Sequence, residues 1–209
     1  MSSLRRTVRG GTLSIVALGA AAVLLAGCGG EKEESASTTA TSNSGRPALD
    51  PSKTHTVTLK TNQGTFAFDL DVKNSPNTTA SFAALVKKGF FDGLTFHRIV
   101  PGFVIQGGDP EGTGSGGPGY SVVDAPPKDT QYKKGLVAMA KTQNEPSGTS
   151  GSQFFVVTSD SVSLPPDYAV LGDVTEGMDT VEKIGKLGNP ADPSGAPTEK
   201  VTIDKMELK

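Results

Sequence analysis

The sequence is poor in the side chains from which metal sites and covalent cross-links are built. Its 209 residues include one cysteine, two histidines and no tryptophan. A single cysteine excludes an internal disulfide framework and any zinc site that needs several cysteines. Two histidines exclude a three-histidine metal site. The formal net charge of −2 gives no electrostatic reason to expect a nucleic acid as a partner.

The only cysteine lies at the end of an apolar segment near the start of the chain. Three arginines before residue 10 precede an uncharged run at residues 13–26. The run is too short for a typical transmembrane helix and is typical of a signal peptide. Residues 25–28, Leu-Ala-Gly-Cys, resemble the lipobox of bacterial lipoproteins. The resemblance implies a signal peptide over residues 1–28, a lipid attached to Cys28, and a protein anchored in the cell membrane on its extracytoplasmic side. An ordinary secretory signal with an incidental cysteine is the alternative.

Residues 29–54 differ in composition from the rest of the chain. They contain no aromatic residue and nine serines or threonines. Such a segment has too little apolar surface to offset the entropy lost on ordering, so we predict a disordered tether. A flexible coil of this length has an end-to-end distance of roughly 28 Å. The tether would hold a single domain, residues 55–209, just off the membrane.

From residue 55 onward, apolar and polar residues alternate in short runs, which predicts β-strands. The expected strands are residues 56–60, 65–70, 95–100, 103–107, 135–140, 153–158, 169–174 and 200–208. One helix is expected to begin at the N-cap Ser75 and to end at Gly89, and a second spans residues 178–187. Because the strands are not interleaved with helices, a doubly wound parallel sheet is excluded. We predict a mainly β domain, a closed eight-stranded antiparallel barrel capped by two helices.

Three segments carry a specific pattern. Residues 96–109 read Phe-His-Arg-Ile-Val-Pro-Gly-Phe-Val-Ile-Gln-Gly-Gly-Asp, residues 135–141 read Gly-Leu-Val-Ala-Met-Ala-Lys, and residues 147–155 read Ser-Gly-Thr-Ser-Gly-Ser-Gln-Phe-Phe. In this order and spacing they resemble the cyclophilin-type peptidyl-prolyl isomerases, over about residues 55–209. The resemblance implies the cyclophilin fold, proline-containing polypeptides as substrates, and acceleration of X–Pro rotation while exported proteins fold.

The chemistry of that reaction agrees with the residues present. Rotation about an X–Pro bond faces a barrier of ~20 kcal/mol set by amide resonance, and lowering it requires no nucleophile, cofactor, metal or proton relay. It requires a site that binds the twisted amide more tightly than the planar one. The prolyl nitrogen of the twisted amide regains a lone pair, which a rigid and permanently charged donor can stabilise. We therefore expect Arg98 to be catalytic, as the resemblance also implies.

The resemblance further implies a set of substrate-binding residues: Phe103, Val104, Gln106, Ala140, Lys141, Gln153, Phe155, Leu164 and Tyr168. Phe103, Val104 and Phe155 match the proline pocket, with Leu164 and Tyr168 beside it. Gln106 matches a glutamine that binds the substrate backbone, Ala140 and Lys141 match a strand edge that pairs with it, and Gln153 borders the neighbouring pocket. Gln106 is also implied to orient the arginine. Three positions depart from the common pattern of the family. Many members have methionine where this chain has Val104, asparagine where it has Lys141, and histidine where it has Tyr168. Lys141 is expected to act mainly through its main chain.

The absence of tryptophan bears on inhibition. In cyclophilins that are strongly sensitive to cyclosporin, an indole at the pocket rim donates a hydrogen bond to the drug. Ser163 stands at the matching position here. We therefore expect cyclosporin to inhibit this protein poorly.

Two other function classes remain open at the level of sequence. One is a proline-peptide binding module without catalysis, a holdase or scaffold. The other is a hydrolase that uses Ser152, His97 and Asp109, although no nucleophile elbow surrounds the serine and we take the histidine as structural. The glycine-rich residues 112–117 formally match a dinucleotide-binding motif, but no helix is expected to follow them, so we interpret them as a loop. A monomer is expected.

Overall fold

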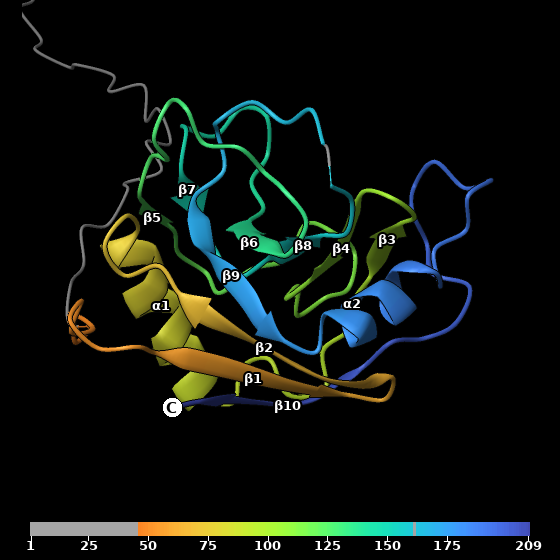
Figure 1. Cartoon of the computed structure of the whole chain (residues 1–209), viewed down its shortest axis with the longest axis horizontal. Helices are drawn as coiled ribbons and strands as arrows, with labels where there is room; N and C mark the ends of the chain where they lie inside the picture. Colours follow the sequence, from red (N-terminus) through yellow and green to blue (C-terminus); the bar gives the residue numbers. More distant parts are fainter. Residues whose placement is uncertain (1–45, 161) are drawn as a thin grey trace, which may run out of the picture. The chain divides into compact units, whose positions relative to one another are not determined.

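The computed structural model describes residues 46–160 and 162–209. The predicted signal peptide, Cys28 and the tether as far as residue 45 lie outside the described residues. Within the described part, two helices and one large antiparallel sheet follow from the predicted pattern (Figure 1). The strands of the large sheet are β1 (Thr56–Thr61), β2 (Gly64–Leu70), β3 (Arg98–Val100), β4 (Val104–Gly107), β6 (Leu136–Met139), β8 (Phe154–Val157), β9 (Val170–Glu176) and β10 (Ile203–Leu208).

The large sheet curls into a barrel that is closed by a short extended segment. Its strand order is β10-β1-β2-β9-β6-β8-β4-β3. The edge strands β3 and β10 share no ladder, but the segment that leads into β3 crosses the seam. The Gly93 N–H donates to the Ile203 carbonyl at 2.7 Å, and the Ile203 N–H donates to the Leu94 carbonyl at 2.8 Å. The predicted mainly β fold class, an eight-stranded antiparallel sheet with two helices, is confirmed. Its edge strands are not paired as a closed barrel would require, and residues 93–96 bridge the gap to residues 201–203 by backbone hydrogen bonds.

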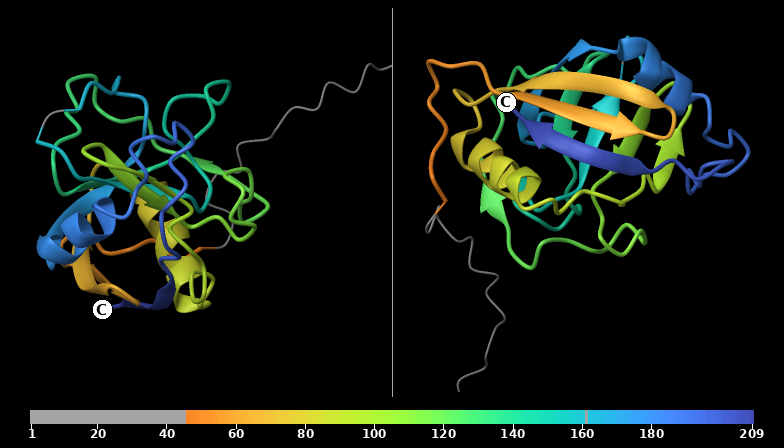
Figure 2. Two further views of the ribbon diagram at one scale, coloured as in Figure 1. Left: turned by 90° about the vertical axis from the view of Figure 1, so that its right-hand side faces the viewer. Right: turned by 90° about the horizontal axis from the view of Figure 1, so that it is seen from below.

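The two helices lie at opposite ends of the sheet (Figure 2). Helix α1 (Pro76–Lys87) packs against β10, and helix α2 (Met178–Gly185) packs against β2, β3 and β4. The predicted cap of α1 is wrong in one respect, because the Ser75 side chain makes no capping hydrogen bond. Asp124 replaces it from a distant segment, since its Oδ2 accepts a 2.6 Å bond from the Thr78 N–H. A carboxylate at a helix N-terminus is favourable for the same reason as a local cap.

A second, two-stranded sheet was not predicted. It pairs β5 (Val122–Val123) with β7 (Thr149–Ser150). Strands of two residues carry too short a pattern to be detected by alternation. Their pairing brings Asp124 to the start of α1.

The end of the predicted tether also differs from expectation. Residues 46–54 have no regular secondary structure but pack on the domain. The Arg46 guanidinium lies 3.8 Å from the centre of the Tyr120 ring, and Leu49 packs against the hydrophobic core. A cation–π contact of Arg46 and the partly buried Leu49 thus hold the last nine residues of the predicted tether against the domain.

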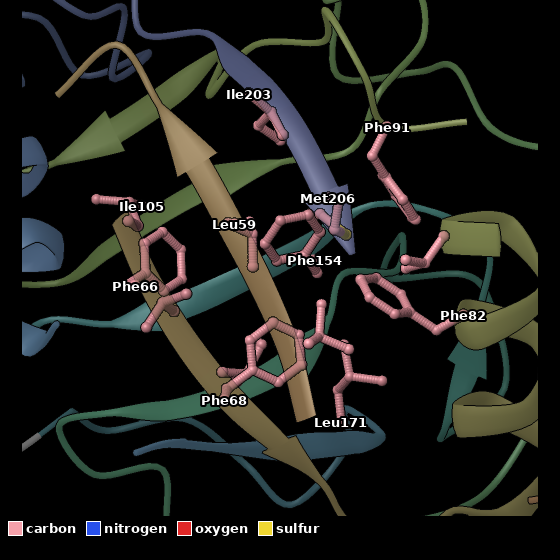
Figure 3. Packing of buried hydrophobic residues seen from close by; sticks show 14 of the residues in the cluster. Leu59, Phe66, Phe68, Phe82, Phe91, Ile105, Phe154, Leu171, Ile203 and Met206 are labelled. Atoms are coloured by element: carbon pink, nitrogen blue, oxygen red, sulfur yellow. The ribbon is translucent and has the colours of Figure 1, made fainter. Parts of the chain in front are cut away.

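Phenylalanines fill the interior of the barrel (Figure 3). Phe154 lies at their centre, fully buried, with edge-to-face contacts at 5.6 Å to Phe82 and 5.9 Å to Phe96. Because successive side chains of a strand point to opposite faces, its neighbour Phe155 lies on the other side of the sheet. There it belongs to a separate apolar cluster with Val104. One strand therefore supplies both the core and the floor of the site described next.

Candidate active site

A pocket opens on the outer face of the sheet, over β3, β4, β6 and β8. It encloses about 190 Å³. It is lined by Arg98, Phe103, Val104, Gln106, Ala140, Lys141, Phe155, Leu164 and Tyr168. All of these were assigned to the site from the sequence. The one remaining predicted residue, Gln153, is hydrogen-bonded to Gln106 just outside the lining.

The floor and one wall of the pocket are apolar and aromatic. Val104 and Phe155 are 2% and 5% exposed. The Tyr168 ring meets the Phe155 ring edge-on at 5.5 Å. A ring the size of proline, which carries no side-chain donor or acceptor, suits such a surface.

Tyr132 holds this wall in place, and sequence reasoning missed it. Its hydroxyl donates to the Tyr168 carbonyl at 2.7 Å and accepts a bond from the Tyr168 N–H at 3.0 Å. Burial raises the pKa of the Tyr132 phenol above its ordinary value, although hydrogen bonds from the backbone of Tyr168 and Asp167 oppose the shift. Tyr132 lies in a loop with no strand pattern around it, so no signal in the sequence connects it to the pocket.

Arg98 lies on β3 directly opposite Gln106 on β4. One of its terminal N–H groups donates to Gln106 Oε1 at 3.4 Å. Among the described residues no carboxylate forms an ion pair with Arg98. The guanidinium thus keeps donors for a ligand in the pocket.

The Lys141 side chain has a structural environment that the sequence did not predict. It is 3% exposed, and its Nζ pairs with Asp167 at 2.5 Å. The same Nζ donates to the carbonyls of Thr142 and Glu145 at 3.2 and 3.1 Å. The ammonium therefore ties the end of β6 to the rim loop that carries Leu164 and Tyr168.

We expect Lys141→Met to lower the free energy of unfolding by about 1–3 kcal/mol at neutral pH, because charged hydrogen bonds in a desolvated place are lost. The hydrogen bond from Lys141 lowers the pKa of Asp167 below its ordinary value. The contribution of Asp167 is thus fully present above the ordinary pKa of about 4 and is lost as the pH falls through the lower folded-state pKa. The free energies of unfolding of the unchanged protein and of Lys141→Met, measured in urea, should therefore differ less at pH 3 than at pH 7.

Lys134→Met is the matched control. Lys134 pairs with Glu182, also at 2.5 Å, but both side chains are at least one-third exposed. Its removal should cost much less stability than the removal of Lys141, because water screens an exposed ion pair. A Lys141→Met deficit that is equally large at pH 3 and pH 7 would contradict a role for the charge pair.

The residues of the hydrolase alternative do not assemble. The Ser152 hydroxyl donates to the Gly108 carbonyl at 2.7 Å. Neither ring nitrogen of His97 has a hydrogen-bond partner in the described part of the chain. Burial lowers the pKa of His97, with Asp109 opposing that shift. A serine and a histidine that do not contact each other form no nucleophile–base pair.

Residues 46–160 and 162–209 contain no cluster of three His, Cys, Asp or Glu side chains placed to hold a metal ion. None of their helices has the length and apolarity to cross a membrane.

The apolar pocket on the outer face of the antiparallel barrel, with an arginine that has no carboxylate partner among the described residues, has the size and polarity to accept a proline ring. Comparisons with known proteins agree. Residues 56–208 match the family model described as "Cyclophilin type peptidyl-prolyl cis-trans isomerase/CLD". The chain belongs to this family of peptidyl-prolyl cis-trans isomerases.

The most similar relatives carry the same activity in their names. A peptidyl-prolyl cis-trans isomerase of Helicobacter pylori is 40% identical over 135 residues, which cover 63% of this chain and 81% of that protein. Peptidyl-prolyl cis-trans isomerase A of Mycobacterium tuberculosis is 36% identical, covering 76% of this chain and 94% of that protein. A crystal structure of a cyclophilin-type isomerase of Cryptosporidium parvum, in the presence of the dipeptide Ala-Pro, matches with a TM-score of 0.67 and 32% identity, covering 74% of this chain and 98% of that one.

Proposed function

We propose that this isomerase uses Arg98 to accelerate X–Pro rotation in polypeptides outside the cytoplasmic membrane, where a lipid on Cys28 anchors it. The observation that carries the catalytic part is the unpaired guanidinium of Arg98 beside an apolar pocket.

The pocket favours the twisted amide in two ways. Phe103, Val104 and Phe155 hold the proline ring in a surface of low polarity, with Leu164 and Tyr168 beside it. A planar amide is more dipolar than a twisted one, so an apolar surface favours the twisted form. Arg98 donates to the prolyl nitrogen, which becomes an acceptor only when the amide twists. An interaction made only in the transition state raises the rate of the chemical step.

The peptide backbone on either side of the proline needs partners of its own. Gln106 offers an amide at the pocket edge. The Ala140 N–H is already bonded to the Gln153 carbonyl at 2.9 Å, whereas no backbone hydrogen bond of Lys141 occurs among the described residues. Lys141 therefore offers a free main-chain donor and acceptor for a substrate strand, while its side chain pairs with Asp167 in the rim loop.

A protease-coupled assay on a short X–Pro peptide tests the catalytic proposal. We expect the cis-to-trans rate to rise in proportion to protein concentration. Peptide binding without acceleration at micromolar protein would support the non-catalytic binding module instead.

The lipid anchor rests on the lipobox at residues 25–28, which lies outside the described residues. Mass spectrometry of the N-terminal peptide from membranes tests it. We expect the mature chain to begin at Cys28 with the added mass of a diacylglyceryl group. A chain that begins elsewhere, or an unmodified Cys28, would contradict the proposal.

Cyclosporin should inhibit this protein poorly. Ser163 is exposed next to Leu164, which lines the pocket, and a serine cannot replace the contact area of an indole. Losing an aromatic anchor costs ~2 kcal/mol or more, about 30-fold in affinity. We expect Ser163→Trp to bind the drug about 30-fold more tightly while peptide turnover changes little. Nanomolar inhibition of the unchanged protein would refute this alignment of the rim.

A further inference from the structure

A buried carboxylate outside the pocket organises the glycine-rich loop at residues 109–117. Asp109 is 1% exposed, and its side chain accepts hydrogen bonds from the N–H groups of Glu111 at 2.8 Å and Gly114 at 2.5 Å. Residue 116 must be glycine, because a Cβ there would clash with Asp109 Oδ1. The loop is therefore folded around this carboxylate, which fixes the position of the Gly116 backbone.

Asp109 is ionised at neutral pH. Burial alone would raise its pKa, but hydrogen bonds from the backbone N–H groups of residues 111, 114 and 116 outweigh it and lower the pKa below the ordinary value. An ionised carboxylate can only accept hydrogen bonds, so it suits a loop that presents several N–H groups.

A chain of hydrogen bonds leads from this loop to Arg98. The Gly116 carbonyl accepts from Gln153 Nε2 at 2.9 Å. Gln153 Oε1 accepts from Gln106 Nε2 at 3.0 Å. Gln106 Oε1 accepts from Arg98 at 3.4 Å. Each glutamine uses its donor end toward the loop and its acceptor end toward the arginine.

The direction of this chain is set at the loop end. A backbone carbonyl can only accept, so Gln153 must turn its NH₂ toward Gly116 and its oxygen toward Gln106. Gln106 must then turn its own NH₂ toward Gln153, which leaves its oxygen for the guanidinium. If Gln153 were free to turn over, its NH₂ would face the NH₂ of Gln106. Gln106 would have to turn as well and would present a donor to a donor at Arg98.

We propose that Asp109 and Gln153 are positioning residues for Arg98: the Asp109 carboxylate fixes the Gly116 carbonyl, and two directed glutamine amides carry that orientation to the guanidinium. The inference rests on the proposed function of Arg98 and adds two residues that do not line the pocket. A misplacement of a catalytic group by a fraction of an ångström lowers the rate without abolishing it. We expect a loss of about tenfold in kcat/KM when this chain of hydrogen bonds is interrupted.

Two variants interrupt this chain of hydrogen bonds at different links. Asp109→Asn replaces one acceptor oxygen by a donor and so loses a backbone bond of the loop. Gln153→Met removes the middle link of the hydrogen-bond chain and leaves the bonds between Asp109 and the loop untouched, which keeps the test valid if Asp109→Asn folds poorly. Asp124→Asn is the matched control, because Asp124 also bonds a backbone N–H but caps helix α1. We expect the control to lose stability and to keep kcat/KM within about twofold of the unchanged protein.

A double-mutant cycle with Arg98→Ala is the decisive measurement. If Asp109 and Gln153 act through Arg98, each variant should lower kcat/KM about tenfold in the unchanged background and less than twofold in the Arg98→Ala background. Equal factors in both backgrounds would overturn the proposal, since they would mean direct substrate contact by Gln153 or general loosening by Asp109→Asn.

An NMR readout of the arginine separates this proposal from the proposed function itself. The Arg98 Nε–Hε resonance should shift or broaden in Asp109→Asn and Gln153→Met and stay unchanged in Asp124→Asn. If Arg98→Ala alone keeps full activity, the catalytic role of Arg98 fails, and the resonance still reports whether the chain positions it. If the resonance is the same in all variants, the positioning proposal fails whatever the activity.

Discussion

The Arg98→Ala protein is expected to fold as the unchanged protein does and to lose about 100-fold or more in kcat/KM. Removing a single donor aimed at developing charge or a developing lone pair typically costs 10²–10³-fold. Arg98 is half-buried on a short strand and, among the described residues, pairs with no carboxylate, so its removal leaves no orphaned buried charge. The measurement is the X–Pro assay together with a thermal unfolding curve.

Arg98→Lys is the control for charge alone. A lysine keeps the positive charge but lacks the planar, multi-donor geometry of the guanidinium, so we expect most of the activity to be lost here too. Peptide affinity should change much less than the rate in both variants, because the donor acts on the twisted amide. A well-folded Arg98→Ala protein with near-normal kcat/KM would contradict the mechanism.

The Cys28→Ser protein should lose its lipid and leave the membrane fraction completely. Cleavage before Cys28 removes three arginines and no acidic residue, which changes the formal net charge from −2 to −5. A mature chain of that charge has no electrostatic attraction to anionic lipid, so binding would depend on acyl chains, at ~0.8 kcal/mol per buried CH₂.

Labelling with a fatty-acid probe and fractionation after a high-salt wash measure this directly. The unchanged protein and a Ser35→Ala control in the tether should take up the probe and sediment with membranes. Cys28→Ser should take up none, and any chain of mature size should be soluble. Mature-size Cys28→Ser protein that still sediments would refute the lipid anchor.

The strands were predictable where side chains alternate over several residues. β1 has this pattern, because one of its faces is buried in the barrel and the other is not. The alternation is incomplete in β2, where residues 66–68 are all buried, and in β10, where Asp204 and Lys205 are both exposed. β8 was found for a different reason, since Phe154 and Phe155 are both buried, one in the core and one in the pocket floor. Its apolar run marks a strand that is covered on both faces.

Features that depend on partners distant in sequence were not predictable. Ser75 looks like a helix cap, yet Asp124, 49 positions away, supplies the cap through a two-residue strand. Residues 46–54 have the composition of a flexible tether, but Arg46 makes a cation–π contact with the Tyr120 ring. Local composition cannot reveal such contacts, because they exist only after the barrel has brought the segments together.

The family resemblance predicted which residues line the pocket. It did not predict the residues behind the lining that hold the rim and the loop in place. Every lining residue of the pocket was named from the resemblance, although Leu164 and Tyr168 lie outside the three motif segments. Lys141, Tyr132 and Asp109, which hold the rim and the loop, were missed or given other roles, since their contacts run through backbone carbonyls and N–H groups. Such contacts leave little trace in residue type.

Exchange NMR on an X–Pro peptide tests the central claim most directly, namely that the pocket catalyses rotation and does not merely bind proline. Uncatalysed exchange takes tens to hundreds of seconds, so free peptide shows separate cis and trans signals without exchange cross-peaks. With a small fraction of the unchanged protein, cross-peaks between the two signals should appear within a second of mixing. With the same amount of Arg98→Ala, the peptide signals should still report binding but show no cross-peaks. Binding by the unchanged protein without cross-peaks would contradict the account.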